Sequence, residues 1–136
     1  MKHRTALSMV CFLFGSAIAL GALGAHTLKE ILTESKLASF ETAVRYQLYG
    51  AIGLAIMALL GMVRKEWNHR WSQYLLAIGT LFFSGSIYVL VFATQPGIRQ
   101  VFGPITPIGG VLMIVAWLLL FIHIQYTKCH KDTYSN

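Results

Sequence analysis

Four long runs of apolar residues dominate the chain, and polar connections separate them. The runs cover about residues 5–25, 44–63, 71–93 and 107–126. A helix needs about 20 mostly apolar residues to cross the hydrocarbon core of a bilayer. We therefore predict an all-α membrane protein in which residues 1–136 form a single domain, a bundle of four transmembrane helices.

The connection over residues 27–41 is longer than the others and has a pattern of its own. Apolar residues such as Leu28 and Ile31 alternate with charged residues such as Lys29 and Glu34. This pattern is typical of a short amphipathic helix that lies on a membrane surface. An ordinary polar loop with a few interfacial anchors is the alternative interpretation.

The composition agrees with a membrane protein. The chain is 56% hydrophobic and 12% charged, whereas about a quarter of the residues in a soluble domain are charged. This balance excludes an ordinary soluble domain, and it also excludes a disordered chain.

Lys and Arg residues are distributed unevenly between the two sides of the predicted bundle. With four spans, the N-terminus, the 64–70 loop and the C-terminal tail share one side, which carries seven of the eleven Lys and Arg residues. Basic connections remain in the cytoplasm, so we predict that both termini are cytoplasmic. The same rule, together with anionic lipid head groups, explains the net charge of +6 better than binding of nucleic acid does.

Small and weakly polar residues gather on one face of each predicted span. Membrane helices pack through such residues because they let the backbones approach closely. The residues to which we assign this role are Gly21, Gly24, Ser84, Gly85, Gly109 and Gly110. A tight bundle held by these faces is favoured over a ligand cavity between the helices.

A cluster of polar residues marks the outer ends of the predicted helices. Glu41 and Arg45 are four residues apart, so they can form an ion pair on one helix face. Thr106 precedes a proline, which predicts that the fourth helix begins there with unpaired N–H groups. Arg45 and these groups can hold an anionic head group or a carboxylate, and a purely interfacial anchor is the alternative. The candidate outer mouth consists of His26, Glu41, Arg45, Tyr46, Gln47, Tyr49 and Thr106.

Residues for metal, redox or enzymatic chemistry are sparse. Cys11 and Cys129 are far apart in the sequence, which excludes a CxxC pair, and the histidines show no metal-ligand spacing. No catalytic motif such as GxSxG or a P-loop occurs. No acid lies deep within a span, which argues against a proton-coupled antiporter. We predict no metal, no cofactor and no enzyme activity.

Four stretches of the sequence form a recognisable set, in the order Ala19–His26, Phe40–Tyr49, Leu81–Tyr88 and Gly103–Gly110. They resemble the YgdD/YwdK-like family of small four-helix membrane proteins, which is classed as a domain of unknown function. The resemblance implies a bacterial plasma-membrane protein, located in the inner membrane if the cell is Gram-negative. It implies no established activity, cofactor or catalytic residue. Members of the family often have a histidine where this chain has Gly50.

These observations favour a non-enzymatic integral membrane protein. We expect it to bind membrane lipid, another membrane protein or a second copy of itself through the small-residue faces and the outer mouth. A small oligomeric carrier or channel for a solute or an ion is the alternative function.

Overall fold

Helices account for almost all of the described chain. The computed structural model describes the backbone of residues 3–63 and 70–133 and the side chains of residues 4–63 and 70–126. Within these residues there is no strand. The elements, in order, are α1 (His3–Leu23), the π-helix η1 (Gly24–Leu28), α2 (Lys29–Ile31), α3 (Glu34–Val63), α4 (Arg70–Phe92) and α5 (Pro96–Thr133).

Four segments are long and apolar enough to cross a membrane. They are Arg4–Ile31, Glu34–Val63, Arg70–Phe92 and Pro96–Tyr126. Each exceeds the roughly 20 residues that a crossing needs. The prediction of an all-α protein with four transmembrane helices is therefore confirmed.

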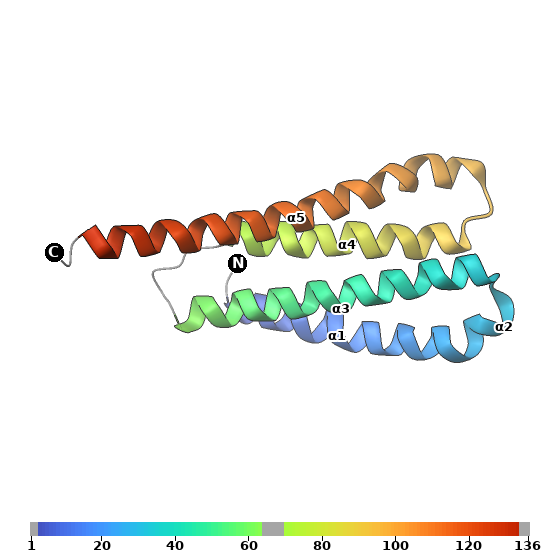
Figure 1. Ribbon diagram of the computed structural model, residues 1–136. Coiled ribbons are helices and arrows are strands. Elements are labelled where there is room, and N and C mark those ends of the chain that lie inside the picture. Colours follow the sequence, from blue (N-terminus) through green and yellow to red (C-terminus); the bar gives the residue numbers. More distant parts are fainter. Residues whose placement is uncertain (1–2, 64–69, 134–136) are drawn as a thin grey trace.

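The described ends of the chain agree with an even number of crossings. The start of α1 and the end of α5 lie at the same end of the molecule (Figure 1). Lys2, Arg64 and Lys65, on which the orientation argument partly rests, lie outside the described residues. A cytoplasmic location for both termini stays a prediction, and from it we call the opposite end of the molecule, where α2 meets α3, the outer end.

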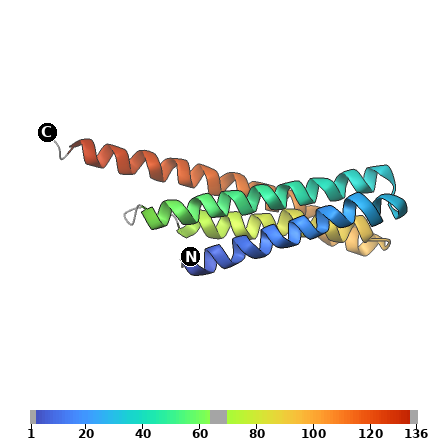
Figure 2. The same ribbon diagram turned by 90° about the horizontal axis from the view of Figure 1, so that it is seen from below.

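The four long helices lie side by side in the order α1, α3, α4, α5 (Figure 1). α4 packs most extensively on α5 and then on α3, which in turn packs on α1. Figure 2 shows that α5 crosses its neighbours obliquely. The main apolar core draws residues from all four helices and includes Ala6, Leu13, Ala51, Leu54, Met57, Leu76, Met113 and Ala116.

Glycines allow the closest approaches between these helices. A Cβ on Gly50 of α3 would lie 2.6 Å from Cγ2 of Thr80 in α4, and a Cβ on Gly79 would lie 2.9 Å from the backbone N of Met113 in α5. Real Cβ contacts are never this short, so a larger residue would force the helices apart. Glycine therefore sets the spacing of the bundle at both crossings.

A second apolar cluster fills the outer end. Phe40 is 1% exposed, and its ring packs against the rings of Tyr88 and Phe92, with centroids 5.1 and 6.4 Å away. A Cβ on Gly24 would lie 3.2 Å from Phe40, so the first residue of η1 leaves room for this ring. The wider turn of η1 also places Leu28 in the same cluster.

Residues 27–41 do not form a separate amphipathic helix. Thr27 to Ile31 continue the first helix, and the chain turns where Leu32 adopts an extended conformation. From Glu34 onward the residues already belong to α3. The amphipathic pattern therefore reflects the ends of two long helices, and their position relative to a membrane surface stays a prediction.

The predicted start of the fourth helix at Thr106 and Pro107 is wrong. α5 begins at Pro96 and continues through Pro104 and Pro107. Proline at the first position of a helix has no N–H to leave unpaired, so Pro96 supplies the signal that the sequence argument assigned to Pro107. Thr106 lies within the helix, and the free N–H groups expected there do not exist.

Candidate functional site

The residues of the predicted outer mouth do not converge on one site. Instead they divide between the helix core, the exposed surface of α3 and two separate hollows. One of the two hollows combines features that the predicted mouth was expected to have.

Gln47 is a core residue. It is 6% exposed, and its Nε2 donates to the backbone O of Leu13 at 3.0 Å and to Oγ of Ser16 at 2.8 Å. Its Oε1 accepts a bond of 2.8 Å from the hydroxyl of Tyr88. The amide thus ties α1, α3 and α4 together and is fully occupied by the protein itself.

Arg45 is exposed and does not form the predicted ion pair with Glu41. Its Nη2 donates to Oγ1 of Thr42 at 3.2 Å. Thr42 is one turn nearer the outer end, and its own hydroxyl donates to the backbone O of Ala38. The guanidinium therefore extends along α3 toward the outer end, while Glu41 stays exposed on the same helix.

Tyr46 and Tyr49 form an exposed aromatic pair on α3. Their ring centroids lie 5.7 Å apart, and the ring of Tyr46 also packs on Phe83 of α4 at 4.5 Å. Both tyrosines are exposed on the apolar outside of the bundle, where aromatic rings contact lipid favourably.

His26 and Thr106 lie in different places. His26 is exposed on η1 and lines a polar hollow of about 540 Å³ with Ala25, Thr27, Lys29 and Glu30. Thr106 faces α4, where its Oγ1 shares a hydrogen bond of 2.7 Å with Oγ of Ser86. These two residues therefore do not act on a common ligand.

A second hollow, which we call the outer cleft, lies between α3, α4 and α5. Its volume is about 350 Å³, and its lining residues are Ser35, Lys36, Ser39, Thr42, Ile87, Leu90, Val91, Arg99 and Thr106. A volume of this size falls at the lower end of the range for small-molecule pockets.

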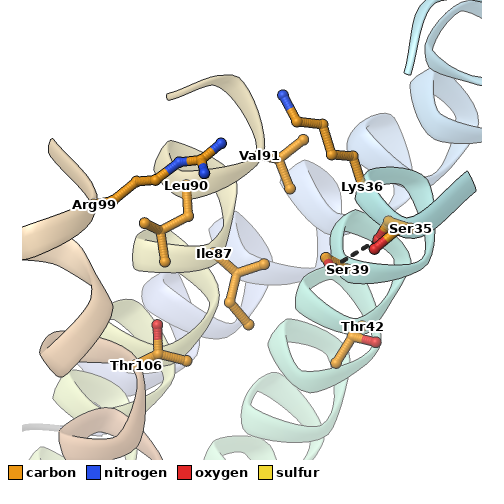
Figure 3. A pocket seen from close by; sticks show the side chains of 9 residues that line it. All are labelled: Ser35, Lys36, Ser39, Thr42, Ile87, Leu90, Val91, Arg99 and Thr106. Atoms are coloured by element: carbon orange, nitrogen blue, oxygen red, sulfur yellow. Dashed lines mark hydrogen bonds between the residues drawn. The ribbon is translucent and has the colours of Figure 1, made fainter. Parts of the chain in front are cut away.

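The chemistry of the outer cleft changes from wall to wall (Figure 3). α4 supplies an apolar floor of Ile87, Leu90 and Val91. Lys36 of α3 and Arg99 of α5 stand on opposite walls at the open mouth, and the hydroxyl-bearing threonines lie deeper. An apolar floor beneath two cations suits an amphiphile with an anionic head group.

Local sequence explains both walls of the cleft. Ser35, Ser39 and Thr42 recur at intervals of four and three residues, which places their side chains on one face of α3. Ser39 donates to the backbone O of Ser35 at 2.9 Å (Figure 3), so this short side chain folds back on its own helix. On the opposite wall, Arg99 donates to the backbone O of Ala93 at 3.4 Å.

The cleft exists because no large side chain fills the space between α3 and α5 at this end. Further in, Trp117 of α5 reaches Gly53 of α3, where a Cβ would lie 2.8 Å from Cζ2 of the indole. Nearer the outer end, Tyr46 packs on Phe83 one turn inward from Thr42 and Ile87. Beyond that pair, α5 presents the small Thr106 in the depth of the cleft and Arg99 at its mouth.

The charged side chains that line the cleft are both basic. None of its nine lining residues is acidic. α3 begins at Glu34 and α5 at Pro96, so the positive dipole ends of two long helices lie beside the cleft, whereas α4 ends at Phe92 and brings its negative end next to Leu90 and Val91. Arg45 adds a further cation through its bond to Thr42.

The residues assigned to helix packing also lie in different environments. A Cβ added to Gly21, Gly24 or Gly110 would contact a side chain of another helix, which is Val44, Phe40 and Phe83, respectively. A Cβ added to Gly85 would face open space. Gly109 lies at the α4–α5 crossing, where its Cβ would be 2.9 Å from the backbone O of Gly79. Ser84 is buried on α4, and its hydroxyl has no hydrogen-bond partner.

Sequence reasoning missed the cleft residues Lys36 and Arg99, because it used Arg99 only in the charge count and Lys36 only there and in the amphipathic pattern of residues 27–41. The spacing of Ser35, Ser39 and Thr42 was the available signal for a polar helix face. Among the described residues there is no group of three His, Cys, Asp or Glu side chains that could hold a metal ion.

Comparison with known proteins identifies the family. The model of the family described as "Protein of unknown function (DUF423)" matches residues 20–110, which is more than half of the chain. No solved structure matches significantly.

Several curated relatives are similar over most of their length. UPF0382 membrane protein SH2409 of Staphylococcus haemolyticus is 40% identical over 122 residues, which cover 90% of this chain and 94% of the relative. YwdK of Bacillus subtilis is 36% identical, with 78% and 84% covered. UPF0382 inner membrane protein YgdD of Escherichia coli is 30% identical, with 77% of each chain covered. The resemblance found in the sequence is confirmed: the chain belongs to the DUF423 family and, with its four spans, is a multi-pass membrane protein.

Proposed function

We propose that this member of the DUF423 family is a non-enzymatic protein of the plasma membrane that binds an anionic lipid in the outer cleft. The name of YgdD, an inner membrane protein, supports this location. The observation that carries the proposal is the cleft itself, in which Lys36 and Arg99 stand above the apolar floor of α4 (Figure 3).

The position of the cleft suits a lipid already in the bilayer. The lining residues lie close to the outer ends of three candidate spans. A head group at the interface would meet Lys36 and Arg99, while its chain passes over Leu90 and Ile87. The exposed pair Tyr46 and Tyr49 continues the same side of α3 inward and would contact that chain.

Transport of a solute or an ion is the alternative function. A transporter exposes polar groups to its substrate near the middle of the bilayer. Here the buried amide of Gln47 is saturated by Leu13, Ser16 and Tyr88, whereas the buried hydroxyl of Ser84 and Oε1 of Gln73 have no hydrogen-bond partner in the described part of the chain. Flux of small solutes or ions into liposomes provides the direct comparison, and robust, saturable flux by the purified protein would favour the carrier or channel instead.

Lipid retention tests the proposal. The protein is purified in mild detergent, and its bound lipids are counted by native mass spectrometry. Leu90→Trp fills the floor of the cleft and should remove the retained lipid. Val89→Trp is the matched control, because the neighbouring Val89 is exposed and does not line the cleft. Equal lipid retention by both variants would contradict the proposal.

A further inference from the structure

We infer that the outer cleft selects lipids whose head group carries a dianionic phosphate, such as a phosphomonoester. This inference rests on the proposed function and specifies the class of lipid. Its basis is the arrangement of charge around the cleft, which has two cations on opposite walls and no acid among the lining residues.

The two cations differ in the contacts that they can offer. Arg99 has a planar guanidinium with five donors, of which one makes a long bond of 3.4 Å to the backbone O of Ala93. Lys36 provides a compact charge on a flexible stem from the facing wall (Figure 3). A phosphate between them can accept a bidentate bond from the arginine and a charge-assisted bond from the lysine.

Charge matching favours a dianion over a monoanion. One negative charge between Lys36 and Arg99 would leave a net positive charge in the cleft. Arg45, held beside the cleft by Thr42, adds to this excess, while the helix dipoles partly cancel because α3 and α5 begin and α4 ends beside the cleft. Glu34 and Glu41, like Arg45, do not line the cleft, so the charge within the cleft itself comes from Lys36 and Arg99.

The apolar floor assigns this phosphate to a lipid rather than to a soluble molecule. Ile87, Leu90 and Val91 form that floor, and they would remain in contact with water beneath a free phosphate. A lipid chain covers them and gains about 25 cal/mol for each Å² of apolar surface removed from water. We therefore commit to a membrane lipid as the occupant.

The test compares two lipids that differ in head-group charge. The full chain is placed in phosphatidylcholine nanodiscs that contain the same mole fraction of either phosphatidate, a phosphomonoester, or phosphatidylglycerol, a phosphodiester. Native mass spectrometry then measures how much of each lipid the protein retains. Wild type should retain phosphatidate several-fold better than phosphatidylglycerol.

Charge variants show whether the two cations cause this preference. Lys36→Gln and Arg99→Gln should each lower phosphatidate retention about fivefold, the factor that corresponds to about 1 kcal/mol per basic residue near a charged membrane surface. The double variant should show no preference between the lipids, and Lys36→Arg should keep it. Lys29→Gln is the matched control, because it removes one charge at the same end and outside the cleft.

The outcomes separate this inference from the proposed function. Equal retention of both lipids by wild type, with both lost in Leu90→Trp, would overturn selection of a dianion and leave lipid binding intact. Retention of both lipids in Leu90→Trp would overturn the proposed function as well. If Lys29→Gln lowers phosphatidate retention as much as Lys36→Gln does, the preference comes from general surface charge and not from the cleft. Displacement of phosphatidate by millimolar inorganic phosphate would overturn the assignment to a lipid.

Discussion

The hydroxyl of Tyr88 donates a hydrogen bond of 2.8 Å to Oε1 of Gln47 and thereby joins α4 to α3 inside the bundle. The other end of the same amide donates to Ser16 and to the backbone of Leu13 in α1. Three helices are thus connected through a single side chain. Since the ring of Tyr88 also packs on Phe40, the connection lies directly beneath the outer apolar cluster.

We expect this network to stabilise the bundle. Tyr88→Phe removes one hydrogen bond and should lower the free energy of unfolding by about 1 kcal/mol. Gln47→Leu leaves the hydroxyl of Tyr88 without its acceptor and removes the bonds to Ser16 and Leu13, so it should cost about 1–3 kcal/mol. Unfolding by denaturing detergent, followed by circular dichroism, measures both changes.

A double-mutant cycle tests whether the two residues act together. The combined variant should lose less stability than the sum of the single variants, because they share one hydrogen bond. Strictly additive losses would show that the bond between Tyr88 and Gln47 contributes nothing to stability.

The crossing of α4 and α5 should tolerate only glycine at position 109. A Cβ there would lie 2.9 Å from the backbone O of Gly79 and 2.8 Å from Cα of Phe83. Since both are backbone atoms, Gly109→Ala must separate the helices, and we expect a loss of about 1–3 kcal/mol in thermal unfolding.

Gly85→Ala is the matched control for this substitution. Nothing lies within 4 Å of a Cβ on Gly85, and alanine favours a helix by up to about 1 kcal/mol over glycine. The stability of the Gly85→Ala variant should be unchanged or slightly higher than that of the wild type. Equal losses in the two variants would show that glycine is needed at position 109 for a reason other than close packing.

The number and approximate position of the spans could be predicted from the sequence, because apolar length alone determines whether a helix can cross a bilayer. The start of α5 could not be predicted from the sequence. Pro96 and Pro107 are equally good first residues of a helix by local rules, and the hydrogen bond between Thr106 and Ser86 appears only when α4 and α5 are packed. The tight contact of Gly79 with α5 is equally a property of the packed pair.

The candidate site was harder to predict for a geometric reason. Sequence position gives the depth of a residue in a span, but not which side of the helix meets a neighbour. Arg45 and Gln47 have nearly the same depth, yet one is exposed and the other is buried between three helices. Lys36 and Arg99 are far apart in the sequence, and only the packing of α3 and α5 on α4 places them at one cleft.

Membrane orientation is open to a direct test with a reporter. We expect alkaline phosphatase, which is active only outside the cytoplasm, to be inactive when fused after Asn136. Fusion after Gln95, in the connection between α4 and α5, should give an active enzyme and serves as the control for expression. The reverse pattern would place the outer cleft on the cytoplasmic side, and the lipid would then come from the other leaflet.

Arg45 should act on the cleft through Thr42 rather than through an ion pair with Glu41. Its guanidinium donates to Oγ1 of Thr42, which lines the cleft, and both charged residues are exposed, so neither is needed to hold the bundle together. Arg45→Gln should therefore lower anionic lipid retention about fivefold, since one cation near the head group is lost.

The stability of the two charge variants provides the comparison that decides this role. Arg45→Gln and Glu41→Gln should each change the free energy of unfolding by less than about 0.5 kcal/mol, as expected for exposed residues. Glu41→Gln should leave lipid retention the same or slightly raised, because it removes a negative charge outside the cleft. If Arg45→Gln lowers stability and leaves lipid retention unchanged, Arg45 is an interfacial anchor and the positive charge of the cleft comes from Lys36 and Arg99 alone.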